Sequence, residues 1–323
     1  MYLSNRKNAR VALWLRCIAA LLLAVPGVSL AQTITEYVIP TANCRPFSIV
    51  TGPDGALWFT EWVGNKIGRI TTEGVFTEYS LPNPDSTPIW IKRGPDGALW
   101  FTEQNGNRIG RITINGEIAE YPLPTPASLP WNLGVGPDGA FWFTQKASLQ
   151  IGRITTEGAI TEYSVPLPPW DIAAGPDGAL WYTERSSNQV ARITTDGVVT
   201  NQYDVPTPQS GPDMIIAGPD DMWFTEQYGT KIVHLTISGE LTEYAVPTPN
   251  SQPGGITIGP DAALWFTEHT GNKIGRMPRT HVFTEYLVPT ENSDPMVIEP
   301  GPDGALWFTE FYGNKIGRIT TPE

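Results

Sequence analysis

The sequence predicts an all-β protein, a closed ring of seven four-stranded antiparallel sheets known as a seven-bladed β-propeller. Three observations predict it. A segment recurs with a period near 42 residues, each repeat holds four strand-like stretches, and the strand missing from the last repeat occurs at the other end of the chain. No stretch beyond residue 31 has the apolar periodicity of a helix.

The repeat is marked by Trp-Phe-Thr-Glu or a near copy of it. These segments begin at Trp58, Trp100, Trp142, Trp181, Trp223, Trp265 and Trp307. Their spacings are 42, 42, 39, 42, 42 and 42 residues, and a period of about 40–45 residues is typical of propeller blades. The shorter step falls in a connection at residues 165–169, so we expect the strands of every blade to be intact.

Each repeat has the same internal order, as the first one shows. An apolar stretch at residues 46–51 leads into a Gly-Pro-Asp-Gly turn and a second apolar stretch at 56–61. A Gly-Asn turn then precedes residues 66–71, and a Glu-Gly turn precedes residues 75–79. Short stretches rich in β-branched and aromatic residues, separated by such turns, predict four antiparallel strands.

Ring closure is predicted from the two ends of the repeat region. The seventh repeat ends at residues 320–323, after its third strand. Residues 33–40 match residues 75–82, which contain the fourth strand of the first repeat. We therefore expect the N-terminal strand 33–40 to complete the last blade, because otherwise two sheet edges would stay unpaired.

Residues 1–31 resemble a secretory signal peptide. Three basic residues precede an apolar run, and Ser29 and Ala31 are small residues suited to cleavage after residue 31. The alternative is an uncleaved membrane anchor, but the apolar core after Arg16 has only about 14 residues, where a bilayer needs ~20. We expect residues 32–323 to form one exported domain, periplasmic or extracellular, with no membrane contact after cleavage.

Composition excludes several classes of partner. With 21 Lys and Arg against 33 Asp and Glu, the net charge is −12, which argues against nucleic acid and anionic membranes. A charged fraction of 17% beside 40% hydrophobic residues argues against disorder. Of the two cysteines only Cys44 follows residue 31, so we expect a buried thiol and no internal disulfide. We expect a monomer.

Residues that recur in every blade are expected to build the scaffold. The seven tryptophans should fill the space between neighbouring sheets, and the recurring Arg of Ile-Gly-Arg and Glu of Thr-Glu-Tyr should form pairs within or between blades. Function should come from positions that differ. In each repeat a proline precedes a variable residue expected at the mouth of the central channel. These residues are Phe47, Ile89, Trp131, Trp170, Asp213, Gly254 and Met296.

Two further features are expected at the same mouth. Counting across the Pro-Asp-Gly hairpin places a ring of acidic and amide side chains there, which would draw cations or hold a hard metal ion. The alternative is that the side chains of this ring cap backbone amides or pair with Lys and Arg. The ring is Glu61, Glu103, Gln145, Glu184, Glu226, Glu268 and Glu310.

Aromatic residues form an expected arc on blades one to four. Trp90, Trp131 and Trp170 join Phe47 there, and Trp62 follows Glu61. Exposed tryptophans at a concave mouth favour stacking on a sugar, an aromatic ring or a flat apolar ligand, including a peptide. The alternative is that these rings plug the channel against one another.

The repeat Gly-Pro-Asp-Gly-Ala-Leu-Trp-Phe-Thr-Glu, followed by Asn-Lys-Ile-Gly-Arg-Ile-Thr, closely resembles that of the virginiamycin B lyase (streptogramin lyase) family over nearly the whole chain after residue 31. The resemblance implies a seven-bladed propeller, metal-assisted elimination that opens a cyclic ester antibiotic, possible use of Mg²⁺, and a catalytic set at the mouth on blades six and seven. Carried over by position, it implies roles for Phe47, Asp294 and Glu310. If a metal is bound, we expect Glu268 of the acidic ring and Glu310 to hold it.

This chain departs from the family where it bears on catalysis. A Pro-His step opening blade six is here Pro253-Gly254, and an acid-Pro-His-Gly step opening blade seven is here Asp294-Pro295-Met296-Val297. Neither Gly nor Met can accept a proton, and elimination needs a base. His269, expected near Gly254, is one replacement; the alternative is a solvent-exposed loop histidine.

Two functions therefore remain open. The favoured one is an exported module that binds a ligand or partner through Phe47, Trp90, Trp131, Trp170, Asp213 and Met296. The alternative is an enzyme, a diverged metal-dependent carbon–oxygen lyase that opens a cyclic depsipeptide such as a streptogramin, with Glu310, Asp294 and His269 in catalysis. Asp213 and Glu268 are the further residues that a metal-dependent activity would use. Whether the chain is an enzyme stays undecided on sequence alone.

Overall fold

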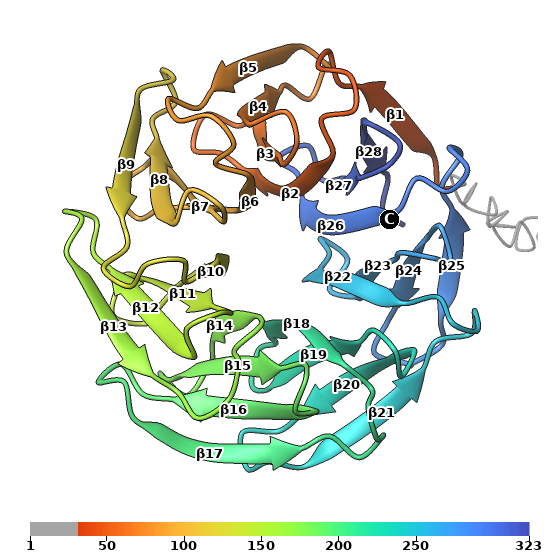
Figure 1. Ribbon diagram of the computed structural model, residues 1–323. Helices are drawn as coiled ribbons and strands as arrows, with labels where there is room; N and C mark the ends of the chain where they lie inside the picture. The colour runs from red at the N-terminus through yellow and green to blue at the C-terminus, as the bar shows by residue number, and fades with distance from the viewer. Residues whose placement is uncertain (1–31, 323) are drawn as a thin grey trace, which may run out of the picture. The chain divides into compact units, whose positions relative to one another are not determined.

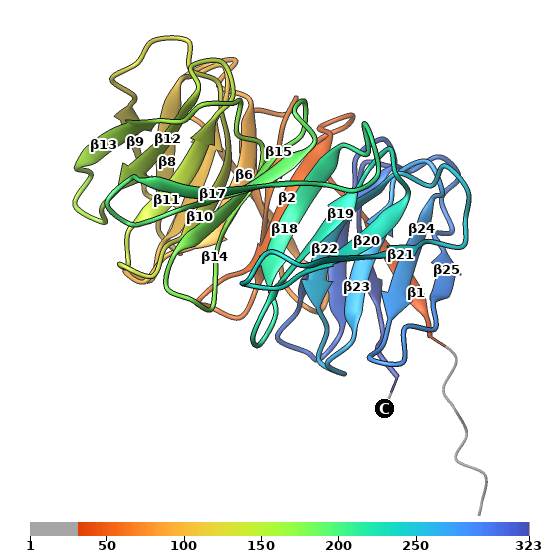
Figure 2. The same cartoon turned by 90° about the horizontal axis from the view of Figure 1, so that it is seen from below.

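The computed structural model describes residues 32–322, and this part of the chain contains 28 β-strands and no helix. The strands form seven separate four-stranded sheets. Figure 1 shows the sheets arranged as blades around one axis, and Figure 2 shows the same ring from its edge. The predicted seven-bladed propeller is confirmed. Within the described residues, no helix is long and apolar enough to cross a bilayer.

Every blade uses its strands in the same order from the axis outward, and the strand bounds repeat closely. The innermost strands are β2 (Pro46–Thr51), β6 (Pro88–Arg93), β10 (Pro130–Val135), β14 (Ile172–Ala174), β18 (Pro212–Ala217), β22 (Pro253–Ile258) and β26 (Pro295–Pro300). The second strands are β3 (Leu57–Glu61), β7 (Leu99–Glu103), β11 (Phe141–Gln145), β15 (Leu180–Glu184), β19 (Met222–Glu226), β23 (Leu264–Glu268) and β27 (Leu306–Glu310).

The two outer positions complete each sheet. The third strands are β4 (Lys66–Ile70), β8 (Arg108–Ile112), β12 (Gln150–Ile154), β16 (Gln189–Ile193), β20 (Lys231–Leu235), β24 (Lys273–Met277) and β28 (Lys315–Ile319). The outermost strands are β5 (Phe76–Ser80), β9 (Ile118–Pro122), β13 (Ile160–Ser164), β17 (Val199–Asp204), β21 (Leu241–Ala245), β25 (Thr284–Leu287) and, in blade seven, β1 (Ile34–Val38).

Ring closure follows the predicted route. Strand β1 pairs antiparallel with β28, from Ile34 opposite Ile319 to Val38 opposite Lys315. The N-terminal strand therefore lies in one sheet with the last three strands of the chain. Residues 1–31 lie outside the described part, so cleavage after Ala31 and export stay predictions.

The repeated tryptophans pack between sheets, as predicted. Trp58 of blade one is fully buried and belongs to a cluster with Ile91, Phe101 and Ile112 of blade two. It also stacks on Tyr79, with ring centroids 5.5 Å apart. Six of the seven are fully buried, and Trp223 of blade five is the exception. Truncating such a ring costs about 3–5 kcal/mol of stability, so these residues hold the blades together.

The recurring charged residues do form pairs, with partners that the sequence did not specify. Arg69 Nε lies 2.7 Å from Asp54 of the Pro-Asp-Gly turn, and Lys66 Nζ lies 3.0 Å from Glu78 of the outermost strand. The Arg–Asp pair recurs in six blades and the Lys–Glu pair in four. Both pairs join strands of one blade.

A threonine from each blade holds the start of the next innermost strand. Thr309 Oγ1 of blade seven donates to the carbonyl of Phe47 in blade one at 2.7 Å, and Thr60 Oγ1 donates to the carbonyl of Ile89 at the same distance. The same bond reaches Trp131, Trp170, Asp213, Gly254 and Met296. The backbone of all seven variable mouth residues is therefore fixed by a residue that does not vary.

Candidate functional site

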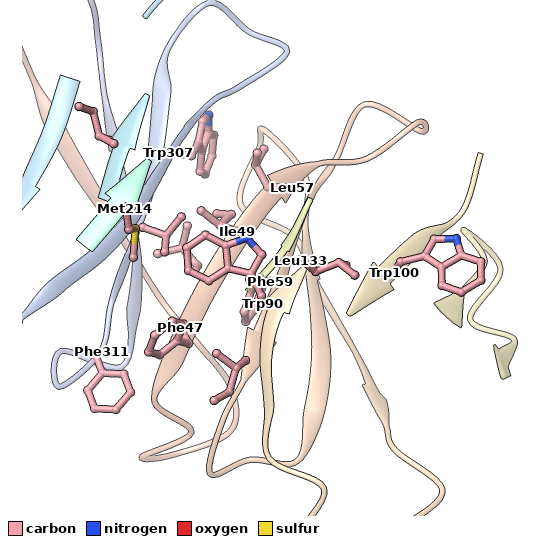
Figure 3. Close-up of a cluster of buried hydrophobic side chains, with 14 of the residues drawn as sticks. Phe47, Ile49, Leu57, Phe59, Trp90, Trp100, Leu133, Met214, Trp307 and Phe311 are labelled. Carbon is pink, nitrogen blue, oxygen red and sulfur yellow. The ribbon is translucent and has the colours of Figure 1, made fainter. Parts of the chain in front are cut away.

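A cavity of about 180 Å³ lies at the end of the ring where the innermost strands begin. Five of the seven variable residues border it: Phe47, Trp131, Trp170, Asp213 and Met296. Trp90, Asp171, Arg185, Met214, Gln227 and His269 complete its lining. Ile89 is instead fully buried. In Figure 3 the side chains of Phe47, Trp90 and Met214 lie near one another, and Trp100 lies farther out in its blade.

The aromatic side chains touch one another and still leave this space. Trp131 and Trp170 have ring centroids 5.0 Å apart with planes tilted by 45°, and Phe47 meets Trp131 edge-on at 5.3 Å. Trp62 lies at the rim, stacked on Phe311 at 5.5 Å. The expected plug is thus partly formed, because the rings are in mutual contact while the cavity beside them stays open.

Two cationic side chains cover the outer faces of these indoles. Lys146 Nζ lies 3.4 Å from the centre of the Trp131 ring and 3.7 Å from that of Trp170, and the Arg185 guanidinium lies 4.4 Å from Trp170. Burial lowers the pKa of Lys146 to about 7, and the charge of Arg185 acts in the same direction. A cation over an indole face is stabilised by the ring quadrupole. The rim therefore carries the Arg185 guanidinium and an amine that titrates near neutral pH, as well as carboxylates.

Two buried carboxylates lie in the cavity wall. Asp213 is 4% exposed, and its Oδ1 lies 3.9 Å from Arg185 Nη1. Asp171 accepts hydrogen bonds from the backbone amides of Ile215 at 2.7 Å and Ile172 at 3.0 Å. Burial raises the pKa of Asp171 to about 8 against those bonds, and the charge of Asp213 also raises it. Together with Trp90 and Met214, Asp171 also borders a second, larger cavity of about 450 Å³ further along the axis.

His269 fills the space that Gly254 leaves. A Cβ atom on Gly254 would lie 1.7 Å from His269 Nε2, so the imidazole occupies the place of the missing side chain. His269 Nδ1 lies 2.9 Å from Asp294 Oδ1, which favours the tautomer with the proton on Nδ1. Nε2 has no hydrogen-bond partner within residues 32–322. His269 is 8% exposed, so the alternative of a solvent-exposed loop histidine is wrong.

The predicted ring of acids does not line the mouth. Glu61 and its equivalents, including Glu268 and Glu310, are fully buried, and none borders the cavity. Glu61 does pair with Pro46 in the ladder, but a register shift follows between Pro46 and Ile49. Its carboxyl lies under the turn at Gly64, where burial and the charge of Glu78 on the outermost strand raise its pKa. The sequence therefore predicted correctly that Glu61 lies at the mouth end of its blade, but it did not predict that the side chain points away from the opening.

The donor groups at the mouth do not fit a divalent cation. Mg²⁺ needs carboxylates that are free to turn toward it. Asp213 faces a guanidinium, both oxygens of Asp171 accept backbone amides, and Asp294 holds His269. Residues 32–322 contain no group of three or more His, Cys, Asp or Glu side chains placed to hold a metal. We assign no chemical step to a metal; the Mg²⁺ implied by the resemblance stays a prediction.

Sequence reasoning missed Lys146, Asp171, Arg185 and Gln227. A signal for three of them was present, because the residue after each Trp-Phe-Thr-Glu segment varies, with six residue types among the seven blades. Those residues are Trp62, Gln104, Lys146, Arg185, Gln227, His269 and Phe311. Antiparallel pairing places this position beside the start of the innermost strand. The position of Asp171, two residues after the recurring proline of each repeat, also varies from blade to blade, so the same signal was present there.

Comparison with known proteins gives one consistent family. The model of the virginiamycin B lyase family matches residues 10–221 and 167–323. A selenomethionine-substituted virginiamycin B lyase from Staphylococcus aureus is 40% identical with a TM-score of 0.85, covering 90% of this chain and all of that one. A streptogramin B lyase structure is 37% identical with a TM-score of 0.86, covering 90% of this chain and 98% of that one.

Other matches are weaker or local. Virginiamycin B lyase from Bacillus licheniformis is 43% identical over 41 residues, so the aligned part spans only 14% of that curated relative and 13% of this chain. Hydrazine synthase of Kuenenia stuttgartiensis, at 15% identity and a TM-score of 0.71, shares the fold alone. The match of the family model over nearly the whole chain decides the relationship: the chain belongs to the virginiamycin B lyase family.

Proposed function

We propose that the chain binds a small ligand with a flat or apolar surface in the mouth cavity. The observation that carries this proposal is the cavity of about 180 Å³ bordered by one phenylalanine and three tryptophans. Ligand sites are typically concave and mainly apolar, with a few polar groups that converge on the ligand. Here the polar groups are Arg185, Asp213, Gln227 and His269.

The direct test is calorimetric titration of residues 32–323 with quinupristin, the ligand named for one S. aureus structure in the family, and with indole and phenylalanine amide. Binding of at least one probe should weaken tenfold or more in Trp131→Ala and Trp170→Ala. Phe76→Ala, on the outermost strand β5 of blade one and outside the lining of every cavity described here, is the matched control and should bind as the parent does. Probe binding that is unaffected by the two mouth variants would contradict the proposal.

A second candidate function is carbon–oxygen lyase activity, and the His269–Asp294 pair favours it. A buried imidazole with an orienting carboxylate on Nδ1 and a free Nε2 beside a cavity can act as a general base. A structure with 40% identity to this chain is described as a catalytically inactive histidine-to-alanine variant with quinupristin, so a histidine matters for catalysis in that protein.

The proposed elimination uses only residues of this chain. His269 Nε2 removes a proton from the carbon next to the ester-bearing carbon. The C–H electrons form a carbon–carbon double bond, the C–O bond breaks, and the ester oxygen leaves as a carboxylate. Asp294 stabilises the imidazolium that forms, and Arg185 lies near enough to the cavity to face the new carboxylate. No water is consumed.

Turnover separates the two candidates. An elimination opens the ring of quinupristin without changing its mass, and the product formed in ¹⁸O-water carries no label. His269→Ala should lower kcat at least a hundredfold, while Asp294→Asn should lower kcat with little change in KM, because Asp294 positions the base. His234→Ala is the matched control. Binding with no ring opening would exclude the lyase for this substrate and leave the binding module.

We also propose that the protein acts outside the cytoplasm as a monomer. The supporting observation is the signal-like segment 1–31, with small residues before Gln32. N-terminal sequencing of the protein recovered from a secreting host should begin at Gln32, and light scattering should give the mass of one chain. A chain recovered with residues 1–31 attached would contradict export by cleavage.

A further inference from the structure

A hydrogen-bonded clamp recurs at the turn between the first two strands of six blades. In blade one, Asp54 accepts from Trp58 Nε1 at 3.0 Å and from Arg69 Nε at 2.7 Å. The same two bonds to one aspartate occur in blades two, three, four, six and seven. These turns lie at the ends of the blades opposite the mouth, because each innermost strand runs from the mouth toward them.

Blade five lacks this clamp for two reasons visible in its sequence. Its turn is one residue shorter, with Gly218-Pro219-Asp220-Asp221-Met222-Trp223 where blade one has seven residues from Gly52 to Trp58. His234 replaces the arginine; it stacks on Trp223 at 4.5 Å, and its Nε2 lies 2.9 Å from Asp221 Oδ2. Trp223 Nε1 has no hydrogen-bond acceptor among residues 32–322.

Blade six departs from the repeat at the adjoining turn. Residues 278–281, Pro-Arg-Thr-His, stand where five of the other blades end the turn with Gly at positive φ. In those blades the glycine lies against a tyrosine of the preceding blade, as Gly239 does against Tyr203. In blade six His281 stacks on Tyr244 with ring centroids 4.4 Å apart.

These departures meet at one cavity of about 330 Å³ between blades five and six. Trp223, His234 and Asp221 border it from blade five, and Leu264, Met277 and Arg279 border it from blade six. Arg279 is exposed and forms no ion pair within the described chain. The cavity thus joins apolar walls to two hydrogen-bond donors that lack acceptors, the Trp223 indole and the Arg279 guanidinium.

We propose that this cavity is a second binding site, for a small carboxylate that carries an apolar ring. The carboxylate would accept from Trp223 Nε1 and Arg279, since guanidinium groups bind carboxylates well. The ring would lie against Leu264 and Met277. Asp221 is already hydrogen-bonded to His234 Nε2 and to the backbone amide of Ile237, at 3.3 Å, so the other acid beside the cavity is the exposed Asp220. This proposal does not depend on the mouth.

The test uses three probes that share one ring and differ in charge: indole-3-acetate, 3-methylindole and tryptamine. They are titrated into ¹⁵N-labelled residues 32–323 carrying Trp170→Ala, which disables the mouth. Indole-3-acetate should shift the indole N–H signal that disappears in Trp223→Phe, and should bind at least tenfold more tightly than the other two. Equal or tighter binding of tryptamine would overturn the carboxylate assignment.

Two variants test the site itself. Arg279→Ala should weaken indole-3-acetate at least tenfold. Trp223→Phe keeps an aromatic ring at this position but removes the indole N–H, so it should also weaken binding. Trp265→Phe makes the same exchange where the N–H already donates to Asp261 at 2.9 Å; it is the matched control and should not weaken binding. Unchanged affinity in both Arg279→Ala and Trp223→Phe, or no binding at millimolar probe, would overturn the proposal, whatever the mouth binds.

Discussion

Two rings of residues lie at the mouth end of the blades and behave in opposite ways. Glu61 and its equivalents recur nearly unchanged, are fully buried, and contact the outermost strand of their own blade. Phe47 and its equivalents differ from blade to blade, and most of them border the cavity. The sequence predicted that the side chains of both rings would line the opening. Only side chains of the Phe47 ring do so, because those of the Glu61 ring are buried within the blades. Repetition in this fold marks residues that maintain the blade, and variation marks residues that can face a ligand.

The buried ring also shows how each blade accommodates two acids. Burial raises the pKa of Glu61 to about 8, with the charge of Glu78 adding to the rise, whereas Lys66 and Thr41 bind Glu78, whose pKa is lowered. A proton on Glu61 would supply the donor that its two oxygens lack. Blade three has an amide instead: Gln145 Nε2 donates to Glu162 at 3.1 Å. In blade four the amide and the acid exchange positions: Gln202 on the outermost strand donates from Nε2 to Glu184 on the second strand at 3.2 Å.

The largest expected effect breaks the scaffold and not the site. Trp142→Ala should lower the free energy of unfolding by about 3–5 kcal/mol, because a fully buried indole between blades is lost. Trp170→Ala, at the partly open mouth, should cost less than about 2 kcal/mol. Urea denaturation of both variants measures the difference. Equal losses would mean that the mouth tryptophans belong to the scaffold as well.

The second prediction concerns how the buried carboxyl group of Glu61 makes stability depend on pH. A buried glutamate whose pKa is raised to about 8 favours folding at acid pH and loses that contribution as the pH rises from its ordinary value toward 8. Glu61→Gln copies the natural arrangement of blade three. It should leave stability at pH 4 nearly unchanged and increase it by on the order of 1–3 kcal/mol at pH 8.

The reverse exchange, Gln145→Glu, is the control for that prediction. It would place a second acid beside Glu162 and should destabilise the protein more at pH 8 than at pH 4. Urea midpoints at the two pH values check both variants. A Glu61→Gln protein whose stability follows the same pH curve as the parent would exclude a protonated Glu61.

The smallest expected effect is spectroscopic. The pKa of Lys146 is lowered to about 7 by burial, so its ammonium charge should appear over Trp131 and Trp170 as the pH falls through that value. Indole emission should therefore change by a few per cent near pH 7, and the change should be absent in Lys146→Met. Fluorescence titration measures it, and stability at pH 8 should hardly differ between the two proteins.

Much of this architecture was predictable because it repeats. The blade number, the four strands per blade and the closing strand 33–40 follow from periodicity. A strand whose bounds are uncertain in one repeat can be placed by comparison with the other six. Side-chain directions at the mouth were harder. Glu61 lies opposite Pro46 at the mouth end of its strand, but its carboxyl packs against the turn at Gly64 and not at the opening. Lys146 and Asp171 were missed because their importance lies in neighbours distant in sequence. Lys146 meets Trp131 of its own blade and Trp170 of the next blade, and Asp171 meets Ile215 of blade five.

The position of β1 has a consequence for the order of events during biosynthesis. Its partner β28 spans Lys315–Ile319, so β1 must wait until about 280 further residues have been made before it can pair. Until then the ring stays open with two unsatisfied edges, and contacts so distant in sequence form slowly. A chain whose ring cannot close until β28 has been made stays unfolded enough to pass a translocation pore for longer, which would suit a polypeptide whose residues 1–31 resemble a signal peptide.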